Sequence, residues 1–283
     1  MRFTIVKSIK AQQKLSRQLI RSGKSIAVVP TMGFLHDGHL SLIKKGLSKA
    51  DIVITTIFVN PTQFAPGEDL TRYPRDEKGD LEKIKQAGSQ IVFIPRLTDM
   101  YPDDYETYVD VENLTLTLEG ESRLQHFKGV TTIVAKLFNI VQPDFALFGM
   151  KDYQQAAVIT KMIKDLNWPT KIIVCPTVRE KDGLAMSSRN SYLTPVQRKQ
   201  ATALYQSLIL ARQMVKSDER RPSEIRKSMR RLIKNAAPDS DIGYIAFTDL
   251  KTLEAKKEIT KNTIASVAVN IGPVRLIDNM RIF

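Results

Sequence analysis

Two histidines lie three positions apart in a glycine-containing segment early in the chain. Residues 30–39 read PTMGFLHDGH, so His36 and His39 are separated only by Asp37 and Gly38. The glycines allow the backbone to turn sharply and to approach a ligand closely. A helix that begins here would add free backbone N–H groups and the positive end of its dipole. The segment therefore predicts a phosphate-binding site, and the structural alternative is a strand–turn–helix whose histidines only cap the turn.

Two further polar segments follow apolar runs. Residues 60–63 read NPTQ, and the amide of Gln63 can both donate to and accept from hydroxyls and carboxylates. Residues 149–152 read GMKD; Lys151 can reach a phosphate, and Asp152 can accept from ribose hydroxyls or cap a helix. An Asn-Pro turn with a solvated glutamine, and a simple helix cap, are the structural alternatives. Both segments are candidate ligand contacts.

The elements that would carry these segments alternate between strands and helices over the first 176 residues. Apolar, β-branched runs predict strands at residues 25–30, 51–59, 90–94, 145–148 and 171–175. Helices are predicted at residues 38–49, 74–88, 131–141 and 152–166. This alternation predicts an open α/β sheet of parallel strands. Ligands of such sheets bind beyond the carboxyl ends of the strands, where the polar segments would lie.

The pattern changes after residue 176. Amphipathic helices are predicted at about 195–216 and 223–236, followed by strands at 242–248, 263–270 and 273–278. Helices followed by strands indicate a smaller α+β domain. We therefore expect two domains, residues 1–176 and 177–283.

Composition excludes several classes of protein. The chain has 283 residues, 42% hydrophobic and 26% charged, which is ordinary for a globular protein and unlike a collagenous or disordered one. No apolar run approaches the roughly 18 residues of a membrane helix, and the first residues show no secretory signal. The single cysteine, Cys175, cannot form an internal disulfide and reads as a small buried hydrophobe. These features predict a cytoplasmic protein that binds no membrane.

The net charge of +13 is concentrated in the second half of the chain. Residues 220–234 contain seven basic residues and one acidic residue, but Ile225, Met229 and Ile233 recur there on one helical face. The basic residues then occupy the opposite face, which we interpret as a solvated surface. Attraction of a polyanion is the alternative. Charge alone does not predict nucleic-acid binding.

The histidine segment resembles a known nucleotide-binding motif. HDGH at residues 36–39 is similar to the HxGH form of the HIGH motif of nucleotidylyl transferases and class I aminoacyl-tRNA synthetases. MSSRN at residues 186–190 resembles the partner KMSKS loop, with Arg189 in place of a lysine. Together with FVNPTQF at residues 58–64 and GMKDYQQ at residues 149–155, these strings have the order and spacing of the pantothenate synthetase (pantoate–β-alanine ligase) family. The resemblance covers nearly the whole chain.

The resemblance implies a fold and a reaction. It implies a Rossmann-like open parallel sheet of the nucleotidylyl transferase type that binds ATP and pantoate, with the C-terminal α+β domain as a lid. In this family the pantoate carboxylate attacks the α-phosphorus of ATP to give pantoyl adenylate and pyrophosphate, and the amine of β-alanine then displaces AMP. A carboxylate is already ionised at neutral pH and needs no general base. The first step therefore needs charge stabilisation and positioning.

The resemblance also implies catalytic residues. His36, His39, Lys151 and Arg189 would supply positive charge, with Mg²⁺ across the phosphates, and His39 matches the family's proton donor. No Asp/Glu/His cluster indicates a dedicated metal site, as expected when Mg²⁺ binds mainly through nucleotide phosphates.

The substrate contacts implied by the resemblance are more numerous. Gln63 and Gln155 match residues that bind pantoate, and Gln63 also matches the β-alanine contact. The implied ATP-binding residues are Met32, Gly33, Phe34, Leu35, His36, Asp37, Gly38, His39, Gly149, Met150, Lys151, Asp152, Val178, Met186, Ser187, Ser188 and Arg189.

Some positions are less defined. Many family members have a polar residue in place of Met150, and Val178 would contact adenine through its backbone or serve only in packing. Glu119 and Arg123 match residues that line the family's site, but RLQHF replaces the usual RPGHF there. We interpret His126 as structural.

Two alternatives to an acid–amine ligase remain. A nucleotidyltransferase would need a phosphorylated acceptor, whereas two neutral glutamines suit a hydroxy acid. A tRNA-binding module is disfavoured by the short chain and by the lack of aromatic residues in the segment 220–234. The expected partners are therefore small-molecule substrates (ATP, pantoate and β-alanine) with no nucleic acid, and the resemblance implies a homodimer.

Overall fold

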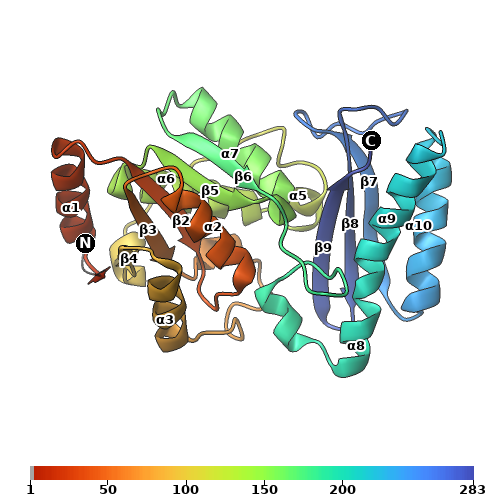
Figure 1. The fold of residues 1–283 in the computed structure, drawn as a ribbon, viewed down its shortest axis with the longest axis horizontal. Helices are drawn as coiled ribbons and strands as arrows, with labels where there is room; N and C mark the ends of the chain where they lie inside the picture. Colours follow the sequence, from red (N-terminus) through yellow and green to blue (C-terminus); the bar gives the residue numbers. More distant parts are fainter. Residues whose placement is uncertain (1–2) are drawn as a thin grey trace. The chain divides into compact units, whose positions relative to one another are not determined.

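Six parallel strands form the sheet of the amino-terminal part of the chain. The computed structural model describes residues 3–283. Along the sheet the strands follow the order β1 (Thr4–Val6), β4 (Ile91–Phe93), β3 (Ile52–Ile57), β2 (Ile26–Thr31), β5 (Phe145–Gly149) and β6 (Lys171–Cys175). Every neighbouring pair is parallel, which confirms the predicted open α/β sheet (Figure 1).

The order of the strands reverses at β2. From this strand the chain builds β3 and β4 on one side and later β5 and β6 on the other. In sheets of this kind, the crevice at such a reversal, beyond the carboxyl ends of the strands, is the usual ligand site. The segment with the two histidines directly follows β2, so the topology places it at this point.

Each strand turns alternate side chains to the two faces of the sheet, and both faces are buried. Ile54 and Phe93 pack in one cluster, and Val53 and Val92 pack in the other. The first cluster is completed by α1 (Ile9–Arg21), α6 (His126–Val141) and α7 (Tyr153–Asp165), the second by α2 (Asp37–Leu47) and α3 (Glu77–Ala87).

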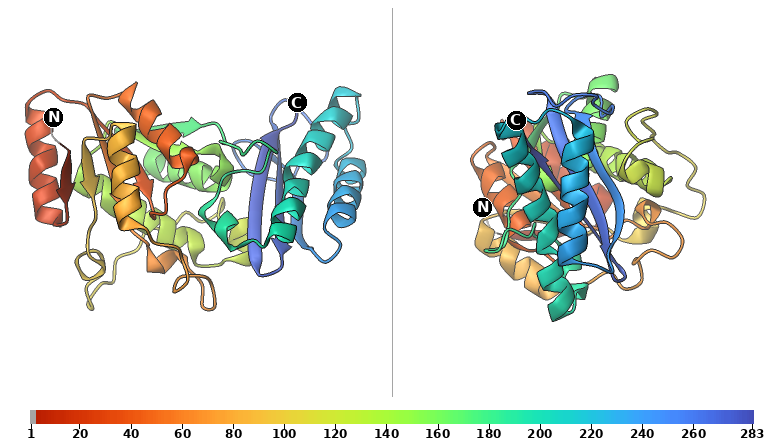
Figure 2. Two further views of the ribbon diagram at one scale, coloured as in Figure 1. Left: turned by 60° about the horizontal axis from the view of Figure 1, so that its bottom comes forward. Right: turned by 90° about the vertical axis from the view of Figure 1, so that its right-hand side faces the viewer.

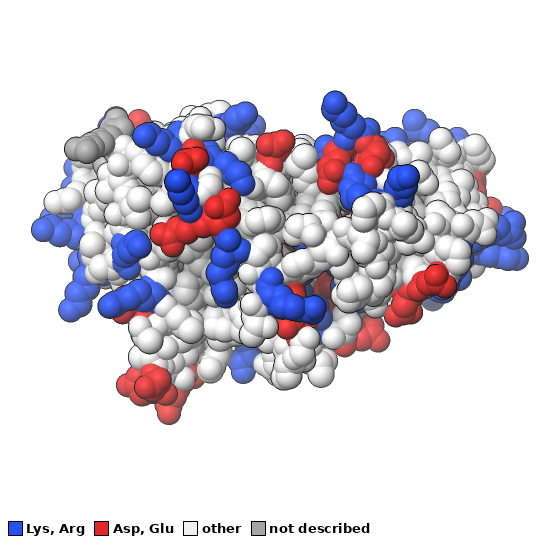
Figure 3. Space-filling view, turned by 90° about the horizontal axis from the view of Figure 1, so that it is seen from below, with Lys and Arg blue, Asp and Glu red and all other residues white. Residues whose placement is uncertain are grey.

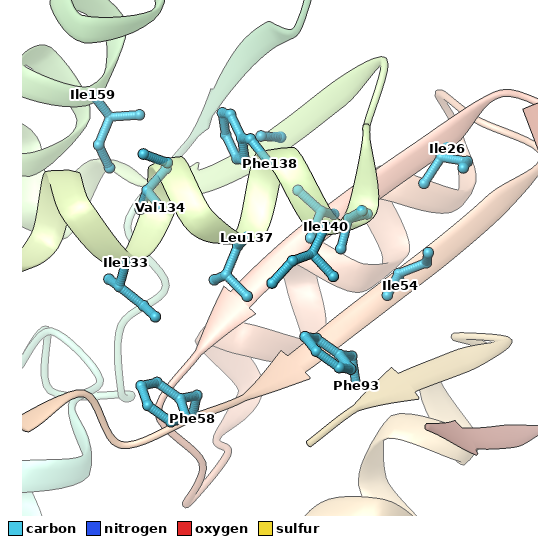
Figure 4. Packing of buried hydrophobic residues seen from close by; sticks show 14 of the residues in the cluster. Ile26, Ile54, Phe58, Phe93, Ile133, Val134, Leu137, Phe138, Ile140 and Ile159 are labelled. Atoms are coloured by element: carbon cyan, nitrogen blue, oxygen red, sulfur yellow. The ribbon is translucent and has the colours of Figure 1, made fainter. Parts of the chain in front are cut away.

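The face covered by α6 illustrates the packing. Figure 4 shows Ile133, Leu137 and Ile140 of α6 pointing toward the strands that carry Ile54 and Phe93. Full burial of each such side chain contributes roughly 1.5–3 kcal/mol. Packing on both faces of the sheet therefore holds in place the carboxyl ends of the strands, which the polar segments follow.

The second part of the chain contains an antiparallel sheet in the order β7 (Asp241–Asp249), β8 (Thr263–Ile271) and β9 (Val274–Arg281). Figure 2 shows α9 (Thr202–Lys216) and α10 (Pro222–Ala236) side by side over one face of it. The short helix α8 (Pro195–Gln200) precedes them. The predicted smaller α+β fold is confirmed.

The chain divides into two compact units. One runs to Gly149 and resumes over Gln155–Pro176; the other comprises Met150–Gln154 and Thr177–Phe283. The five residues of the short segment directly follow β5, yet they group with the second unit. The 3-10 helix Met150–Asp152 (η2) lies in this segment.

Several predicted elements differ in their bounds. The helix expected from residue 131 begins at His126 and so includes Gly129. A glycine is required inside the helix there, because a Cβ would come within 2.3 Å of the Thr62 carbonyl oxygen. The helix expected from residue 74 begins at Glu77 after its cap, Asp76. The predicted helix 195–216 is interrupted at Ala201, whose backbone keeps helical torsion angles.

The sequence did not reveal β1 or α1. On the inner face of α1, Gln12 and Ser16 are buried together with Leu19, and the Gln12 Nε2 atom donates to the Ser16 Oγ atom at 3.1 Å. A polar pair on the buried face interrupts the apolar periodicity by which a helix is recognised.

Burial agrees with the interpretation of the basic segment. In α10, Ile225, Met229 and Ile233 are buried, while the basic residues after Glu224 are exposed. Figure 3 shows basic side chains scattered over one face of the molecule, with acidic side chains among them.

Cys175 is buried, as predicted, and burial raises the pKa of its thiol. No helix within residues 3–283 combines the length and the apolar character needed to cross a membrane.

Candidate active site

The turn between β2 and α2 has an unusual backbone. Gly33 has φ +83° and Phe34 has φ +50°. The left-handed region costs a non-glycine residue free energy, so such a conformation persists only where the surroundings impose it. Gly33 is also confined, because a Cβ would come within 3.1 Å of the Asp80 Oδ2 atom.

Asp80 of α3 holds this turn. Its carboxylate accepts from the backbone N–H groups of Phe34 and Leu35, both at 2.7 Å, while the Lys83 ammonium donates to the Leu35 carbonyl at 2.9 Å. Burial raises the pKa of Asp80, and the two amide bonds partly counter that rise. The sequence analysis missed Asp80; one acidic residue in a polar helix gives no signal of its own.

The two histidines cap the helix that follows. His36 is the cap of α2, and its Nδ1 atom accepts from the Gly38 N–H at 3.2 Å; the His39 Nδ1 atom accepts from the His36 N–H at 3.3 Å. The rings lie 4.1 Å apart, centroid to centroid. Since both Nδ1 atoms accept from the backbone, the hydrogen-bond pattern assigns the ring protons to Nε2. Both imidazoles therefore present Nε2–H donors beside a helix N-terminus.

Gln63 is joined to the histidine segment. It ends the 3-10 helix Pro61–Gln63 (η1) after β3, and its Nε2 atom lies 2.9 Å from the sulfur of Met32. The Oε1 atom accepts from the buried Asn60 amide at 3.2 Å. Candidate phosphate-binding and acid-binding residues thus meet within the first unit.

A polar network fixes the backbone of Gln63. Its carbonyl accepts from the His126 Nδ1 atom at 2.8 Å and from Arg123 at 3.3 Å. Arg123 is also paired with Glu68 through two bonds of 2.6 and 2.7 Å. Glu119, buried at the start of the short helix α5 (Glu119–Ser122), precedes this network.

Electrostatics define the protonation states in this network. Burial, followed by the positive charge of Arg123, lowers the pKa of His126 to about 4, so its ring is neutral and Nδ1 is the donor. Burial alone would raise the pKa of Glu68, but bonding to Arg123 outweighs it and the pKa is lowered. The network is therefore an ion pair beside a neutral imidazole. The interpretation of His126 as structural fits this role.

The second unit carries the other predicted ATP contacts except Gly149. Met150, Lys151 and Asp152 form η2, in which the Lys151 ammonium lies 3.3 Å from the Asp152 carboxylate. Asn279 of β9 donates to the carbonyls of Met150 and Lys151 at 2.9 and 2.8 Å. The sequence analysis did not single out Asn279.

A tight hairpin precedes the Met186–Arg189 loop. The Met186 N–H donates to the Val178 carbonyl at 3.0 Å, and Arg179 pairs with Ala185 in a β-bridge. Ser187 then caps the 3-10 helix Ser188–Tyr192 (η3) through the Arg189 N–H. The loop is thus an ordered turn rather than an extended strand.

The predicted site residues therefore fall into two sets. The first unit brings together residues 32–39 and Gln63, and it contains Gly149 at the end of β5 and the partly buried Gln155 in the first turn of α7. The second unit contains residues 150–152, Val178 and residues 186–189. Within residues 3–283, no group of three His, Cys, Asp or Glu side chains could hold a metal ion.

Comparison with known proteins decides the family. The sequence model of the family described as pantoate-beta-alanine ligase matches residues 4–281. The chain belongs to this family. The resemblance read from the sequence is thereby confirmed, and with it the expectation that the chain is a ligase.

Relatives and solved structures agree with this assignment. A pantothenate synthetase of Geobacter sulfurreducens is 51% identical over 275 residues, 97% of each chain, and one of Moorella thermoacetica is 53% identical over 258 residues, 91% of each chain. A crystal structure of pantothenate synthetase from Thermus thermophilus has a TM-score of 0.94, with 38% identity over 99% of this chain and 100% of that one. A pantoate-beta-alanine ligase from Francisella tularensis, complexed with beta-gamma ATP and beta-alanine, has a TM-score of 0.83, with 35% identity over 99% and 97%.

Proposed function

We propose that this member of the pantoate–β-alanine ligase family condenses pantoate with β-alanine to pantothenate in two steps, through a pantoyl adenylate, and releases pyrophosphate and AMP. The observation that carries the proposal is the contact between Gln63 and Met32, because it joins an acid-binding amide to the first residue of the segment 32–39, which leads into the α2 N-terminus. Adenylation requires these two kinds of group side by side.

In the first step, the pantoate carboxylate attacks the α-phosphorus of ATP and pyrophosphate leaves. Gln63 and Gln155 hold the acid through their amides, which can serve both its hydroxyls and its carboxylate. The Nε2–H groups of His36 and His39, with Lys151 and Arg189, stabilise the charge that develops on the phosphates. His39 donates to the oxygen that bridges to the leaving group.

ATP is bound by backbone groups and by the side chains of four segments. We assign its contacts to residues 32–39, to residues 149–152, to Val178 and to residues 186–189. The α2 N-terminus supplies N–H groups and a favourable dipole for the phosphates. When bound with the nucleotide, Mg²⁺ would be held chiefly by phosphate oxygens and would neutralise part of their charge, since the histidine, lysine and arginine side chains proposed for this site are not the oxygen ligands that Mg²⁺ prefers.

In the second step, the amine of β-alanine attacks the acyl carbon of the adenylate and AMP leaves. Gln63 orients the β-alanine as well as the pantoate. We assign pantoate binding and the main part of ATP binding to residues 1–176. Residues 177–283 are assigned the role of a lid that adds the contacts of Val178 and residues 186–189, since a reactive acyl adenylate must be protected from water. A homodimer is the expected assembly.

The experiment that tests the proposal is exchange of labelled pyrophosphate into ATP. Exchange should require pantoate and Mg²⁺ but not β-alanine. Gln63→Ala and Gln155→Ala should each lower it, since loss of positioning by about 1 Å can cost ~10²-fold. The control is Gln90→Ala, which removes the same side chain from a position directly before β4, where Gln90 accepts from the Val53 N–H near the start of β3. This control should leave exchange intact.

The outcomes separate the mechanisms. Addition of β-alanine to the same mixture should yield pantothenate and AMP, identified by mass. Exchange that appears only when the amine is present would exclude a free-standing adenylate. Absence of pantothenate from the complete mixture would exclude the ligase activity.

A further inference from the structure

Two adjacent residues near the end of the chain hold the two segments of the second unit that carry proposed phosphate contacts. Asp278 and Asn279 lie on β9 and are only 3% and 5% exposed. Consecutive residues of a strand point to opposite faces of its sheet. The two side chains therefore reach different partners from one point on the backbone.

Asn279 holds the turn that carries Lys151. Both hydrogens of its amide are used, one on the Met150 carbonyl at 2.9 Å and one on the Lys151 carbonyl at 2.8 Å. Both carbonyls belong to η2, which leads directly into α7, so one buried amide binds two consecutive residues of this turn. The Asn279 side chain thereby ties η2 to β9.

Asp278 holds the hairpin that precedes Arg189. Its carboxylate accepts from both terminal nitrogens of Arg179, at 2.5 and 2.9 Å, and bidentate ion pairs of this kind are strong and directional. Arg179 also donates to the Gly183 carbonyl at 3.1 Å and lies 4.3 Å from the centre of the Tyr205 ring. The start of the hairpin is thereby fixed from three sides.

The two supports are themselves connected, because the Asn279 N–H donates to the Asp278 Oδ1 atom at 2.8 Å. We propose that Asp278 and Asn279 are positioning residues for adenylation, which fix the Lys151 turn and the Met186–Arg189 loop relative to each other. The inference rests on the proposed function, since it takes Lys151 and Arg189 as phosphate-binding groups. Neither positioning residue is proposed to contact substrate.

The test compares Asn279→Ala with Asn270→Ala, a matched change on the neighbouring strand whose amide bonds the Asp241 carboxylate at 3.1 Å. The measurement is β-alanine-independent pyrophosphate exchange as a function of ATP and of pantoate. We expect Asn279→Ala to slow exchange at least ~10-fold, the scale of a misplaced reacting group, and to raise the KM for ATP, with the KM for pantoate unchanged. Asn270→Ala should match wild type throughout.

A double mutant shows whether Asn279 acts through Lys151. If it does, the combination of Asn279→Ala with Lys151→Ala should be no slower than Lys151→Ala alone, because residues that act as a unit are not additive. Asp278→Asn, which weakens the bond to Arg179, should show the same non-additivity with Arg189→Ala. Should Asn279→Ala not fold, Asn279→Ser retains one donor and serves the same comparison.

The outcomes test the positioning role of Asn279 separately from the proposed function. Wild-type kinetics in folded Asn279→Ala, or equal rises in the KM values for ATP and pantoate, would overturn the inference while the proposed function stands. Full additivity with Lys151→Ala would also overturn it. Wild-type exchange in Lys151→Ala would remove the phosphate role of that lysine and the inference with it.

Discussion

At the scale of single residues, hydrogen bonds to the backbone define the chemistry of the two histidines. Because the Nδ1 atoms of His36 and His39 accept from N–H groups, each ring carries its proton on Nε2, the atom that we propose as the phosphate donor. These backbone hydrogen bonds keep both rings in the Nε2–H tautomer, so neither ring has to change tautomer to donate from Nε2. It also means that each ring has a structural role, which an alanine substitution would remove together with the donor.

A pair of substitutions at His39 separates the two roles. Asn resembles the Nδ1 side of the ring and can still accept from the His36 N–H, whereas Gln resembles the Nε2 side and keeps the outer donor. We expect His39→Asn to fold but to lose ~10²-fold or more in turnover, the scale of one transition-state contact. His39→Gln should retain more activity. Steady-state kinetics with saturating ATP measure both; equal activities would contradict the assignment of Nε2–H as the functional donor.

The neutral His126 predicts a pH dependence of stability. Its folded pKa of about 4 lies below its ordinary value, so between about pH 6.5 and 4 the unfolded chain binds a proton that the folded protein does not. The free energy of unfolding should therefore fall as the pH falls through this range, by about 2–3 kcal/mol from this residue. His126→Asn keeps a donor for the Gln63 carbonyl but cannot be protonated there. Urea unfolding at several pH values should show a flatter profile for the variant, and parallel profiles would refute the assignment.

At the scale of elements, α3 supports a turn that belongs to its neighbours. Asp80 accepts from two consecutive N–H groups of the strained β2–α2 turn, and Lys83, one turn later, donates to the same backbone. The helix thus fixes the entry to α2, and through it the direction of both imidazoles.

Asp80→Asn tests this support. The asparagine NH₂ group would face one of the two backbone N–H groups that the carboxylate now accepts from, and two donors cannot bond each other. We therefore expect a loss of about 1–3 kcal/mol in stability and a clear fall in the rate of adenylation. Asp76→Asn on the same helix is the control, because asparagine is also a good N-cap. Thermal unfolding and pyrophosphate exchange measure the two effects. Wild-type exchange in a destabilised Asp80→Asn would show that the turn does not depend on this carboxylate.

At the scale of the whole molecule, the proposed ATP contacts are shared by two compact units. The Met186–Arg189 loop lies in the second unit, and its proposed role as part of a lid requires Arg189 during adenylation. The net charge of +13 gives no separate indication of function, because basic and acidic side chains are interspersed on the face seen in Figure 3.

Arg189→Ala should slow pantoate-dependent pyrophosphate exchange by ~10²-fold, because one charge that stabilises the phosphates is lost. Arg230→Ala is the control: it removes the same charge from the exposed face of α10. The two variants have equal net charge, so any difference arises from position. Equal rates for the two would contradict the lid.

Sequence alone determined the parts of this protein that local physics controls. Buried β-branched runs such as residues 51–59 predicted strands at the right positions, and a helix start beside two glycines and two histidines predicted a candidate phosphate-binding segment. The four strings of the resemblance predicted the family. These features can be recognised in the sequence because each depends only on residues that are close together in the chain.

Only the tertiary structure decided the supports of the site. Asp80, Asn279 and Asp278 act on backbone or side chains that are distant from them in the chain, and an isolated carboxylate or amide carries no local sign of such a partner. The helix α1 was missed because its buried face contains a polar pair, Gln12 and Ser16. Residue type and spacing encode what a segment can do, whereas the residues that hold it in place are defined by contacts that exist only once the chain has folded.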